Sequence, residues 1–459
     1  MKRPVFYILL LVAFGNELAI ADSFSLHQAI ATAILNNPFQ EANSSLVQAA
    51  RLDASAIRKN SIYPSVTLSS GYTRTKTDVT ATPISFSNSP VASISASETI
   101  YDGGASKQTA NAADWRAKAL EAQLNSTDSL VRNTRGQLAS TVFQHYRSVA
   151  STLVELQLDS DRILLLKTIL PYIDFPAGIA QVTNLLSSVQ INYDKKQVDL
   201  IAAKADFKHV CYIEVPDNLE TLEMTDNRML LDLRPYFLDV SLAISTAKQK
   251  NQNYLAYAYQ AEETKATESA ERARLTRPQV NFVVGDSYSR LKMSGLPGST
   301  TRSPYVGVTV NFPFGGGTRD SLESGKLKVL SAEDNVRAQT DEFTYQITSN
   351  ISRVISAEPV VAATSANLAS LKDQIDRFRA NVSSKSKIDK STLDALIDTL
   401  NQFDKTAGDY YNLLGADLSY RYSLEVQIGI LFDGVQFGFR NSNSVCANVR
   451  PISSPYLCK

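Results

Sequence analysis

The sequence repeats itself at a spacing of about 214 residues, and this repeat most limits what the chain can fold into. The segment "LHQAIATAILNNPFQEA" at 26–42 aligns with "VSLAISTAKQKNQNYLA" at 240–256, which places Asn37 on Asn251. Further on, "YPSV" in the first copy aligns with "RPQV" in the second. Two copies of one pattern should form the same elements in the same order.

Glycines occupy matching places in the two copies. Gly315, Gly316 and Gly317 in "NFPFGGGTRD" align, with a shift of one, with Gly103 and Gly104 in "IYDGG". A phosphate-binding loop needs a lysine and a hydroxyl at fixed offsets after its glycines, and the sequence supplies neither. We therefore interpret both clusters as sharp turns, because glycine adopts unusual backbone angles without steric cost.

Each copy shows the pattern helix, strand, strand, long helix. The first helix should end ahead of Pro64 in one copy and Pro278 in the other, because the residue before a proline prefers extended angles. Alternation with period two then predicts strands with one apolar face and one face of serine, threonine and glycine. The apolar positions are Val66, Leu68, Tyr72, Ile94, Ala96, Ile100, Val306, Val308, Val310 and Phe312. A strand from Gln279 to about Arg290 should pair with the last of these. The segments 76–90 and 291–304, rich in Ser, Thr, Gly and Pro, are predicted exposed loops.

Heptad spacing of apolar residues follows the glycines and predicts long helices with coiled-coil packing. A single helix from Ala105 to Leu170 would be on the order of 100 Å long at about 1.5 Å per residue. Shorter return helices are expected at 181–207 and from 391 onward. Pro359 lies inside the second long helix and is expected to kink or interrupt it.

Composition and simple motifs exclude several classes of protein. The first 21 residues have the basic start, short apolar run and small-residue end of a secretory signal peptide. No later segment contains about 20 consecutive apolar residues, so no transmembrane helix is predicted. The formal net charge is zero, which argues against a nucleic-acid partner. The three histidines are scattered, and no hydrolase motif occurs, so we expect no metal, no cofactor and no enzyme activity.

Two of the three cysteines lie together near the end of the chain. Cys446 and Cys458 can close a disulfide loop in an exported protein, or remain two thiols, and the sequence leaves both open.

Four half-apolar strands cannot bury themselves. If the apolar face meets lipid, every backbone group must be paired and the sheet must close into a barrel. The smallest such barrels use about eight strands, so the chain must oligomerise to complete its own sheet.

Taken together, the repeat, the "NNP" of the first helix, the "YPSV" and "RPQV" strand starts, the "YDGG" and "FGGG" strand ends and the "GIAQVTNLL" hairpin resemble the TolC family of outer-membrane efflux and type I secretion channels. The resemblance covers about 26–433. It implies a mixed α and β fold, with a coiled-coil helical barrel in the periplasm and four strands per chain in a trimeric transmembrane β-barrel. The expected domains are a signal peptide at 1–21, a first repeat at 22–213, an irregular equatorial linker at 214–238, a second repeat at 239–433 and a tail at 434–459. The glycine clusters become the elbows between strands and helices.

The resemblance also assigns a periplasmic gate. In the family, rings of aspartate line this constriction, and here Asp394 and Asp398 occupy the matching helix, four residues apart. Lys390 lies where the family often has a basic residue, and Asn184 where it often has an aspartate, which puts a gate-locking contact through that position in doubt. Three copies of the acids around one axis would attract cations, whereas the simpler alternative is a solvated helix face.

A second set of positions resembles the tip to which a periplasmic adaptor docks. These residues are Gly178, Ile179, Leu185 and Leu186, and apolar side chains there fit a core between paired helices equally well. The implied partners are two further copies of the chain, an adaptor, an inner-membrane transporter and outer-membrane lipid.

The leading functional hypothesis is a passive outer-membrane channel, the exit duct of a tripartite efflux pump or a type I secretion system. The alternative is an outer-membrane-anchored structural or adhesive protein whose heptads form a stalk. Anchors of that kind usually lie at one chain end, whereas strands recur here in the middle of both copies. The cargo, small molecules or a polypeptide, is not encoded in these features.

Overall fold

The computed structural model describes residues 23–60, 63–77, 85–127, 134–293, 298–313, 315–384 and 387–432. The predicted signal peptide and the Cys446 and Cys458 pair lie outside these residues. The chain divides into two compact units. Unit 1 comprises residues 1–40, 135–246 and 345–459, and unit 2 comprises residues 41–134 and 247–344.

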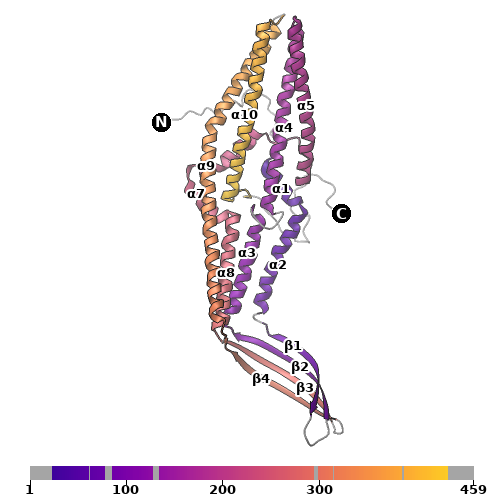
Figure 1. The fold of residues 1–459 in the computed structure, drawn as a ribbon, viewed down its shortest axis with the longest axis vertical. Coiled ribbons are helices and arrows are strands. Elements are labelled where there is room, and N and C mark those ends of the chain that lie inside the picture. The colour runs from indigo at the N-terminus through magenta and orange to yellow at the C-terminus, as the bar shows by residue number, and fades with distance from the viewer. Residues whose placement is uncertain are drawn as a thin grey trace. The chain divides into compact units, whose positions relative to one another are not determined.

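Helices make up most of the described chain (Figure 1). They are α1 (Leu26–Asn36), α2 (Pro38–Asn60), α3 (Ala105–Asn125), α4 (Arg135–Ile169), a 3-10 turn (Leu170–Tyr172), α5 (Pro176–Cys211), α6 (Leu222–Leu238), α7 (Val240–Lys250), α8 (Gln252–Thr276), α9 (Thr318–Ser384) and α10 (Lys390–Ile428).

The four strands lie in unit 2 and form one antiparallel sheet. They are β1 (Ser65–Thr77), β2 (Ser85–Tyr101), β3 (Gln279–Met293) and β4 (Ser299–Asn311). Their order in the sheet is β1-β2-β3-β4, so sequence neighbours pair even though a helix-containing segment separates β2 from β3 (Figure 1). The strands are longer than expected, and much of the predicted loops at 76–90 and 291–304 is therefore strand. Phe312, predicted to extend β4, lies just beyond it.

Asn37 and Asn251, which align in the sequence, each lie between two consecutive helices. Asn37 ends α1, and its side chain accepts a hydrogen bond from the Phe39 amide at 2.9 Å. Asn251 separates α7 from α8 and accepts from the Tyr254 amide at 2.9 Å. Asparagine is favoured here because its side chain satisfies backbone donors at a helix start.

The structure corrects four expectations about the helices. The single helix predicted from Ala105 to Leu170 is two helices, because α3 ends at Asn125 and α4 begins at Arg135. The return helix begins earlier than expected, with Pro176 in its first turn, a position where the missing N–H costs nothing. The predicted irregular linker contains α6. Pro359 does not interrupt α9.

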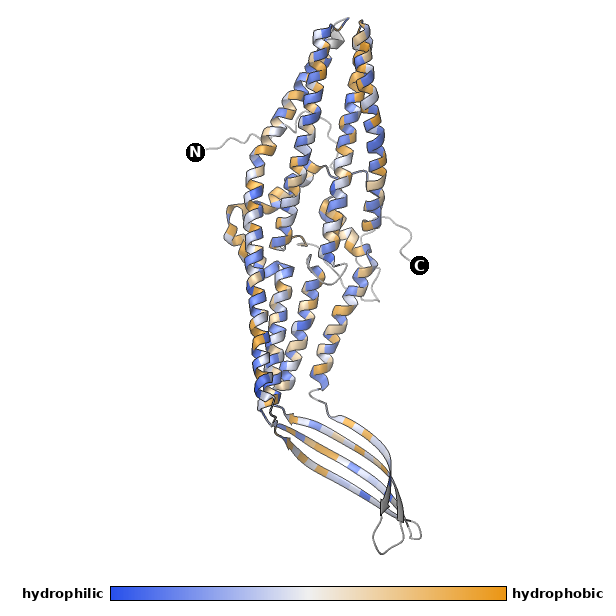
Figure 2. Cartoon of the chain, in the orientation of Figure 1, coloured by the Kyte–Doolittle hydropathy of each residue, from blue (hydrophilic) through white to orange (hydrophobic). Residues whose placement is uncertain are grey.

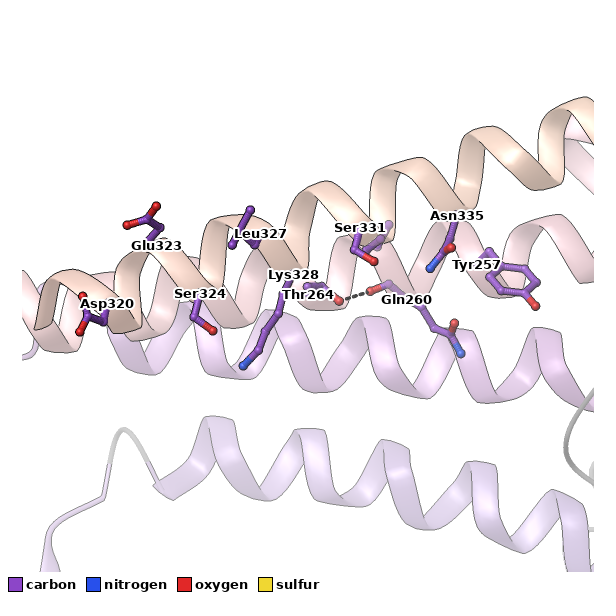
Figure 3. Close-up of a pocket in the computed structure, with 12 residues that line it drawn as sticks. Tyr257, Gln260, Thr264, Asp320, Glu323, Ser324, Leu327, Lys328, Ser331 and Asn335 are labelled. Carbon is purple, nitrogen blue, oxygen red and sulfur yellow. Dashed lines mark hydrogen bonds between the residues drawn. The ribbon is translucent and has the colours of Figure 1, made fainter. Parts of the chain in front are cut away.

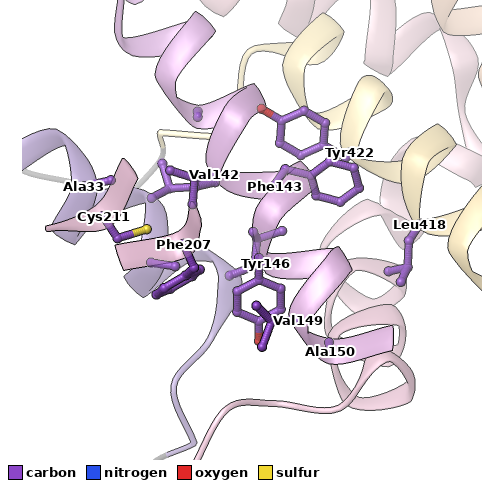
Figure 4. Close-up of a cluster of buried hydrophobic side chains, with 14 of the residues drawn as sticks. Ala33, Val142, Phe143, Tyr146, Val149, Ala150, Phe207, Cys211, Leu418 and Tyr422 are labelled. Atoms are coloured by element: carbon purple, nitrogen blue, oxygen red, sulfur yellow. The ribbon is translucent and has the colours of Figure 1, made fainter. Parts of the chain in front are cut away.

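Unit 1 is built around a core of large side chains. Phe143 and Tyr422 stack with ring centroids 4.3 Å apart, and Phe207 is completely buried close by (Figure 4). The Tyr146 hydroxyl donates to the Phe24 carbonyl oxygen at 3.1 Å, which satisfies its polar end inside the core. The third cysteine, Cys211, is buried in the same cluster, and burial raises the pKa of its thiol to about 12.

The helices of unit 2 pack through alanine. Along α3 and α8 the buried residues are nearly all alanine, and these two helices are in extensive contact. Small side chains let two helix backbones approach closely but bury little apolar area each. Ion pairs tie α2 to α3, including Arg51 with Glu121 at 2.6 Å.

One described segment of α9, Thr318–Asn381, is long and apolar enough to cross a membrane when judged by length and composition alone. Little of that apolar stretch is buried within the chain.

Candidate functional site

The sheet of unit 2 has two chemically different walls. In the strand register, Val66 pairs with Ala96, Ala96 with Val284, and Val284 with Val306. These residues therefore share one side of the sheet, because residues paired across strands point to the same face. We call this side the apolar wall, and it comprises Val66, Leu68, Tyr72, Ile94, Ala96, Val280, Phe282, Val284, Val306, Val308 and Val310. Figure 2 shows the alternation of hydrophobic and hydrophilic residues along the strands.

The opposite side is the polar wall. Val91 and Val283 lie on it, and its other residues include Ser65, Thr67, Ser69, Ser93, Ser95, Ser97, Asn281, Gly285, Tyr305, Gly307 and Thr309. Serine hydroxyls bridge β1 to β2, with Ser69 and Ser93 oxygens 2.6 Å apart. The Tyr305 ring covers Gly285 so closely that a Cβ there would lie 2.5 Å from the ring. Small hydroxylated side chains suit a surface in contact with water, whereas most large apolar side chains lie on the other wall.

The elbow between β2 and α3 requires its two glycines. Gly103 and Gly104 have φ angles of 68° and 90°, in the left-handed region that other residues rarely adopt. Arg277, in the turn between α8 and β3, packs on Gly103 and donates from Nη1 to its carbonyl oxygen at 2.5 Å. A Cβ on Gly103 would lie 2.7 Å from the Arg277 Cβ. The elbow between β2 and α3 is thus locked to the helix-to-strand turn between α8 and β3.

Asp102 completes this elbow. Its carboxylate accepts from the amides of Gly104 at 2.9 Å and Ser106 at 2.5 Å, which satisfies the exposed start of α3. Partial burial raises the pKa of Asp102, but hydrogen bonds from Ser106 and Gly104 outweigh it and leave the pKa below its usual value.

The second elbow, between β4 and α9, is built differently. Gly315, Gly316 and Gly317 lie at the predicted place, but none of them has a positive φ. A Cβ on Gly316 or Gly317 would meet nothing within 4 Å. The reasoning from unusual backbone angles therefore applies to the first elbow and is wrong for the second.

Two helical hairpins of unit 1 meet at their tips. The connection between α4 and α5 and the connection between α9 and α10 form a parallel β-bridge at Ile173 and Ile388. The Ile388 amide donates to the Tyr172 carbonyl oxygen at 2.8 Å, and Lys387 pairs with Asp174 at 3.0 Å. The backbone bridge and the ion pair join the hairpins at one point, which we call the tip contact.

A second link between the same hairpins lies further along the helices. Arg162 of α4 forms an ion pair with Asp404 of α10 and donates to the Asn401 side chain at 3.2 Å. The Arg162 side chain is largely buried, and this desolvation lowers the pKa of its guanidinium. Sequence reasoning missed both links, since the partners are far apart in the chain and each residue alone resembles an ordinary surface charge.

The predicted gate residues lie near the tip contact. Lys390, Asp394 and Asp398 are on the first turns of α10, with Lys390 and Asp398 exposed and Asp394 half-buried. Neighbouring Leu393 is fully buried, so the acids lie beside the apolar stripe that packs inward. Asn184 is exposed on α5.

The predicted docking residues divide into two groups. Gly178 is buried under the Phe175 ring, and Leu185 and Leu186 pack against the apolar cluster of the hairpins. Ile179 is 41% exposed. The structure therefore places Leu185 and Leu186 partly in the core, and Ile179 at the surface.

Unit 2 also carries an open groove between α8 and the start of α9 (Figure 3). The groove has a volume of about 810 Å³. Its lining combines small and polar residues from both helices, including Gln260, Thr264, Ser324, Lys328 and Asn335. A second groove of about 750 Å³ opens among α2, α3 and α8 of the same unit. Such small-residue surfaces resemble the seam between α3 and α8, where two helices do pack. Within the described residues, no cluster of His, Cys, Asp or Glu has the makings of a metal site.

The chain matches no protein-family model and no curated protein by sequence. Solved structures do match over most of its length. The outer membrane protein VceC from Vibrio cholerae is 12% identical, with 88% of this chain and 96% of that chain covered and a TM-score of 0.65. CusC, a protein studied for transmembrane channel formation, is 16% identical, with 89% and 92% covered and a TM-score of 0.64. The chain has the fold of the TolC-family outer-membrane channels. The open-state MtrE outer membrane channel of Neisseria gonorrhoeae is also similar, at 15% identity, 88% coverage of each chain and a TM-score of 0.59. The resemblance drawn from the sequence is thus confirmed at the level of the fold.

Proposed function

We propose that this TolC-like chain is one protomer of an outer-membrane channel that exports substrates, as the exit duct of a tripartite efflux pump or a type I secretion system. The similar solved structures support this, because they are described as outer-membrane channels. The observation that carries the proposal is the sheet, which has one apolar wall, one polar wall and two edges, β1 and β4.

These edges support a trimer. An isolated four-stranded sheet exposes unpaired backbone groups on β1 and β4, which no lipid environment tolerates. Because β1 and β4 run in opposite directions, β4 of one copy can pair antiparallel with β1 of the next. Three copies then close a barrel of twelve strands, an even number within the range of such barrels. The apolar wall would face lipid, and the polar wall would line a water-filled pore.

The helices of unit 2 support the same assembly. Two grooves are open in a single chain, one between α8 and α9 and the other among α2, α3 and α8. Neighbouring copies of the chain would cover both. The apolar stretch of α9 would be covered in the same way, so its membrane-like composition needs no helix within the bilayer.

The gate is proposed at the tips of the unit 1 hairpins. Three copies of Asp394 and Asp398 would ring the axis and favour cations over anions. The tip contact and the Arg162 link would hold the hairpins in the closed arrangement. They would take the place of the gate-locking contact that an aspartate makes in the family and that Asn184 cannot make. Ile179, exposed beside this tip, would contribute to docking of a periplasmic adaptor, which in turn joins the channel to an inner-membrane transporter.

Conductance in planar bilayers tests the function. The detergent-extracted protein, with chain number determined by cross-linking, should form trimeric, cation-selective pores. Asp394→Ala with Asp398→Ala should shift the reversal potential toward that of an unselective pore. As a control, Asp341→Ala with Asp409→Ala removes two exposed acids elsewhere on α9 and α10 and should leave selectivity unchanged.

Two results would count against parts of the proposal. Trimeric pores whose selectivity survives loss of both acids would keep the channel and remove the gate assignment. A well-folded protein that never conducts would favour the outer-membrane-anchored stalk instead.

A further inference from the structure

Three arginines lie at the loop end of the apolar wall, on three different strands. Arg74 of β1, Arg290 of β3 and Arg302 of β4 have the same strand parity as the apolar residues, and all three are exposed. We call them the arginine collar. Charged residues are expensive on a lipid-facing surface, so their position on this wall requires an explanation.

The height of the collar matches one hydrocarbon thickness. Arg74 and Arg302 lie eight residues along their strands from Val66 and Val310, and Arg290 lies ten from Val280. At about 3.4 Å per residue and a strand tilt of about 40°, these separations correspond to roughly 21 to 26 Å along a barrel axis. The apolar band of such barrels is about 25 Å tall, which places the collar at the level of the lipid headgroups.

Tyrosines mark the same level. Tyr72 lies two residues before Arg74, and Tyr288 two residues before Arg290, on the same wall and exposed. Aromatic rings with a polar end favour the boundary between hydrocarbon and headgroups. On β1 and β3, apolar residues are therefore followed by a tyrosine and then by an arginine toward the loop end. On β4, Arg302 is itself the register partner of Tyr288.

Two acids lie below the collar on this side of the sheet. Glu98 is the register partner of Phe282 near the elbow end, and Asp286 is paired with a collar arginine. Asp286 pairs in register with Pro304 inside the apolar wall, and its Oδ2 accepts from Arg302 Nε at 2.6 Å. Arg302 remains three-quarters exposed while making this contact. A planar guanidinium has five N–H donors, so Arg302 can hold Asp286 and still donate to a second oxyanion.

We propose that the arginine collar binds phosphate groups of the lipid leaflet that surrounds the loop end of the sheet. The argument is charge complementarity: three guanidinium groups form a positive belt at headgroup height, above an apolar band that would hold the acyl chains. Arginine is suited to this because its fork matches the geometry of phosphate oxygens. The proposal rests on the proposed function, because it takes the apolar wall to face lipid, and it adds the headgroup chemistry that this wall selects.

Lipid binding in detergent tests the collar without requiring a conducting channel. The purified protein is titrated with phosphatidylglycerol or phosphatidylcholine of identical acyl chains, and bound lipid is counted by native mass spectrometry. We expect preference for phosphatidylglycerol, weakened by salt because the charges are exposed. Arg74→Gln, Arg290→Gln and Arg302→Gln together should reduce phosphatidylglycerol binding at least about tenfold and change phosphatidylcholine binding much less, because choline already neutralises the phosphate of that lipid.

Three controls keep the result specific. Replacing the same arginines by lysine should retain most of the binding, because lysine keeps the charge. Arg234→Gln, Arg337→Gln and Arg377→Gln remove three exposed arginines from α6 and α9 and should change nothing. Asp286→Asn should strengthen binding, because it frees Arg302, and a misfolded variant would not produce that gain.

The outcomes separate this proposal from the channel itself. Undiminished phosphatidylglycerol binding by the triple glutamine variant overturns the collar even if the protein conducts. Displacement of the lipid by a few millimolar inorganic phosphate would indicate a small-anion site and also overturns it. Loss of binding in the triple variant of a protein that never conducts would support the collar and count against the channel.

Discussion

Unit 1 and unit 2 bury their residues in different ways. All of the largest fully buried side chains, such as Tyr146, Phe207 and Leu393, lie in unit 1. Unit 2 buries mainly alanine in its helices, with Phe343 as a large exception, and many of its large apolar side chains are exposed on the apolar wall. Unit 1 therefore has a core of large side chains, whereas unit 2 leaves much of its apolar surface exposed in the single chain.

The difference in burial predicts how each unit is stabilised. Burying a large apolar side chain contributes about 1.5 to 3 kcal/mol, and an alanine methyl much less. Unit 1 should hold its fold in a single chain, and unit 2 should depend on assembly. The following changes test that comparison, in order of expected effect.

Truncation in the unit 1 core should have the largest effect. Phe207→Ala leaves a cavity at a fully buried position and should lower the free energy of unfolding by about 3–5 kcal/mol. Chemical denaturation of the detergent-solubilised protein measures this. Phe39→Ala, at a side chain that is 54% exposed, is the matched control and should cost less than about 1 kcal/mol. Equal costs for the two variants would contradict the idea of a self-sufficient core.

Overpacking the alanine-lined contact between α3 and α8 of unit 2 should have the second-largest effect. Ala119→Leu inserts a large side chain at a buried position of α3 and should cost about 1–3 kcal/mol, because α3 and α8 must separate. The cost should appear mainly as weaker assembly, measured by sedimentation in detergent. Ala395→Leu, at an exposed position of α10, should assemble as the wild type does.

The two elbows should differ in their tolerance of alanine. Gly103→Ala forces a left-handed φ of 68° on a residue with a Cβ and drives that atom into Arg277, so we expect a loss of about 1–2 kcal/mol. Gly316→Ala has neither problem and should stay within about 0.5 kcal/mol of the wild type. Thermal unfolding of both variants makes the comparison, and an equal loss would remove the asymmetry between the elbows.

The smallest expected effect is a dependence of unit 1 on pH. Burial raises the pKa of Asp226 to about 7, beside Arg421 at 3.3 Å, and the hydrogen bond to Glu425 raises the pKa of His27. A raised folded-state pKa contributes stability that is full below the unfolded value and is lost as pH rises through the folded value. Both groups therefore make unit 1 more stable at pH 6 than at pH 8, by about 1 kcal/mol for Asp226.

Denaturation at the two pH values tests this sign. Asp226→Asn cannot titrate and should flatten the dependence. A wild-type protein that is more stable at pH 8 would show that Arg421 holds Asp226 ionised, contrary to this account.

The sequence predicted the sheet well because the relevant signal is local. Alternation along each strand assigned Val66, Leu68 and Val306 to apolar faces, and the register confirms that they share one wall. The glycine clusters likewise lie at the two strand-to-helix connections. The fold class followed from these patterns together with the family resemblance.

Contacts between distant residues could not be predicted in the same way. The lock of Arg277 on Gly103 joins residues 174 positions apart, and the ion pair of Asp174 with Lys387 depends on two turns meeting at one tip. The break between α3 and α4 was also missed, because heptad spacing continues on both sides of it. Such features depend on tertiary geometry, which periodicity does not encode.

Cross-linking of the sheet edges tests the central claim most directly. Thr67→Cys on β1 and Thr309→Cys on β4 are introduced into a chain with Cys446→Ser and Cys458→Ser, while buried Cys211 is retained. After treatment of the detergent-extracted protein with a short bis-maleimide, a denaturing gel should show covalent dimers and trimers and nothing larger. A variant with only one of the two new cysteines should show only uncross-linked chains. A double variant that stays monomeric although its unit 1 core is folded would contradict the claim that the sheet is completed by other copies of the chain.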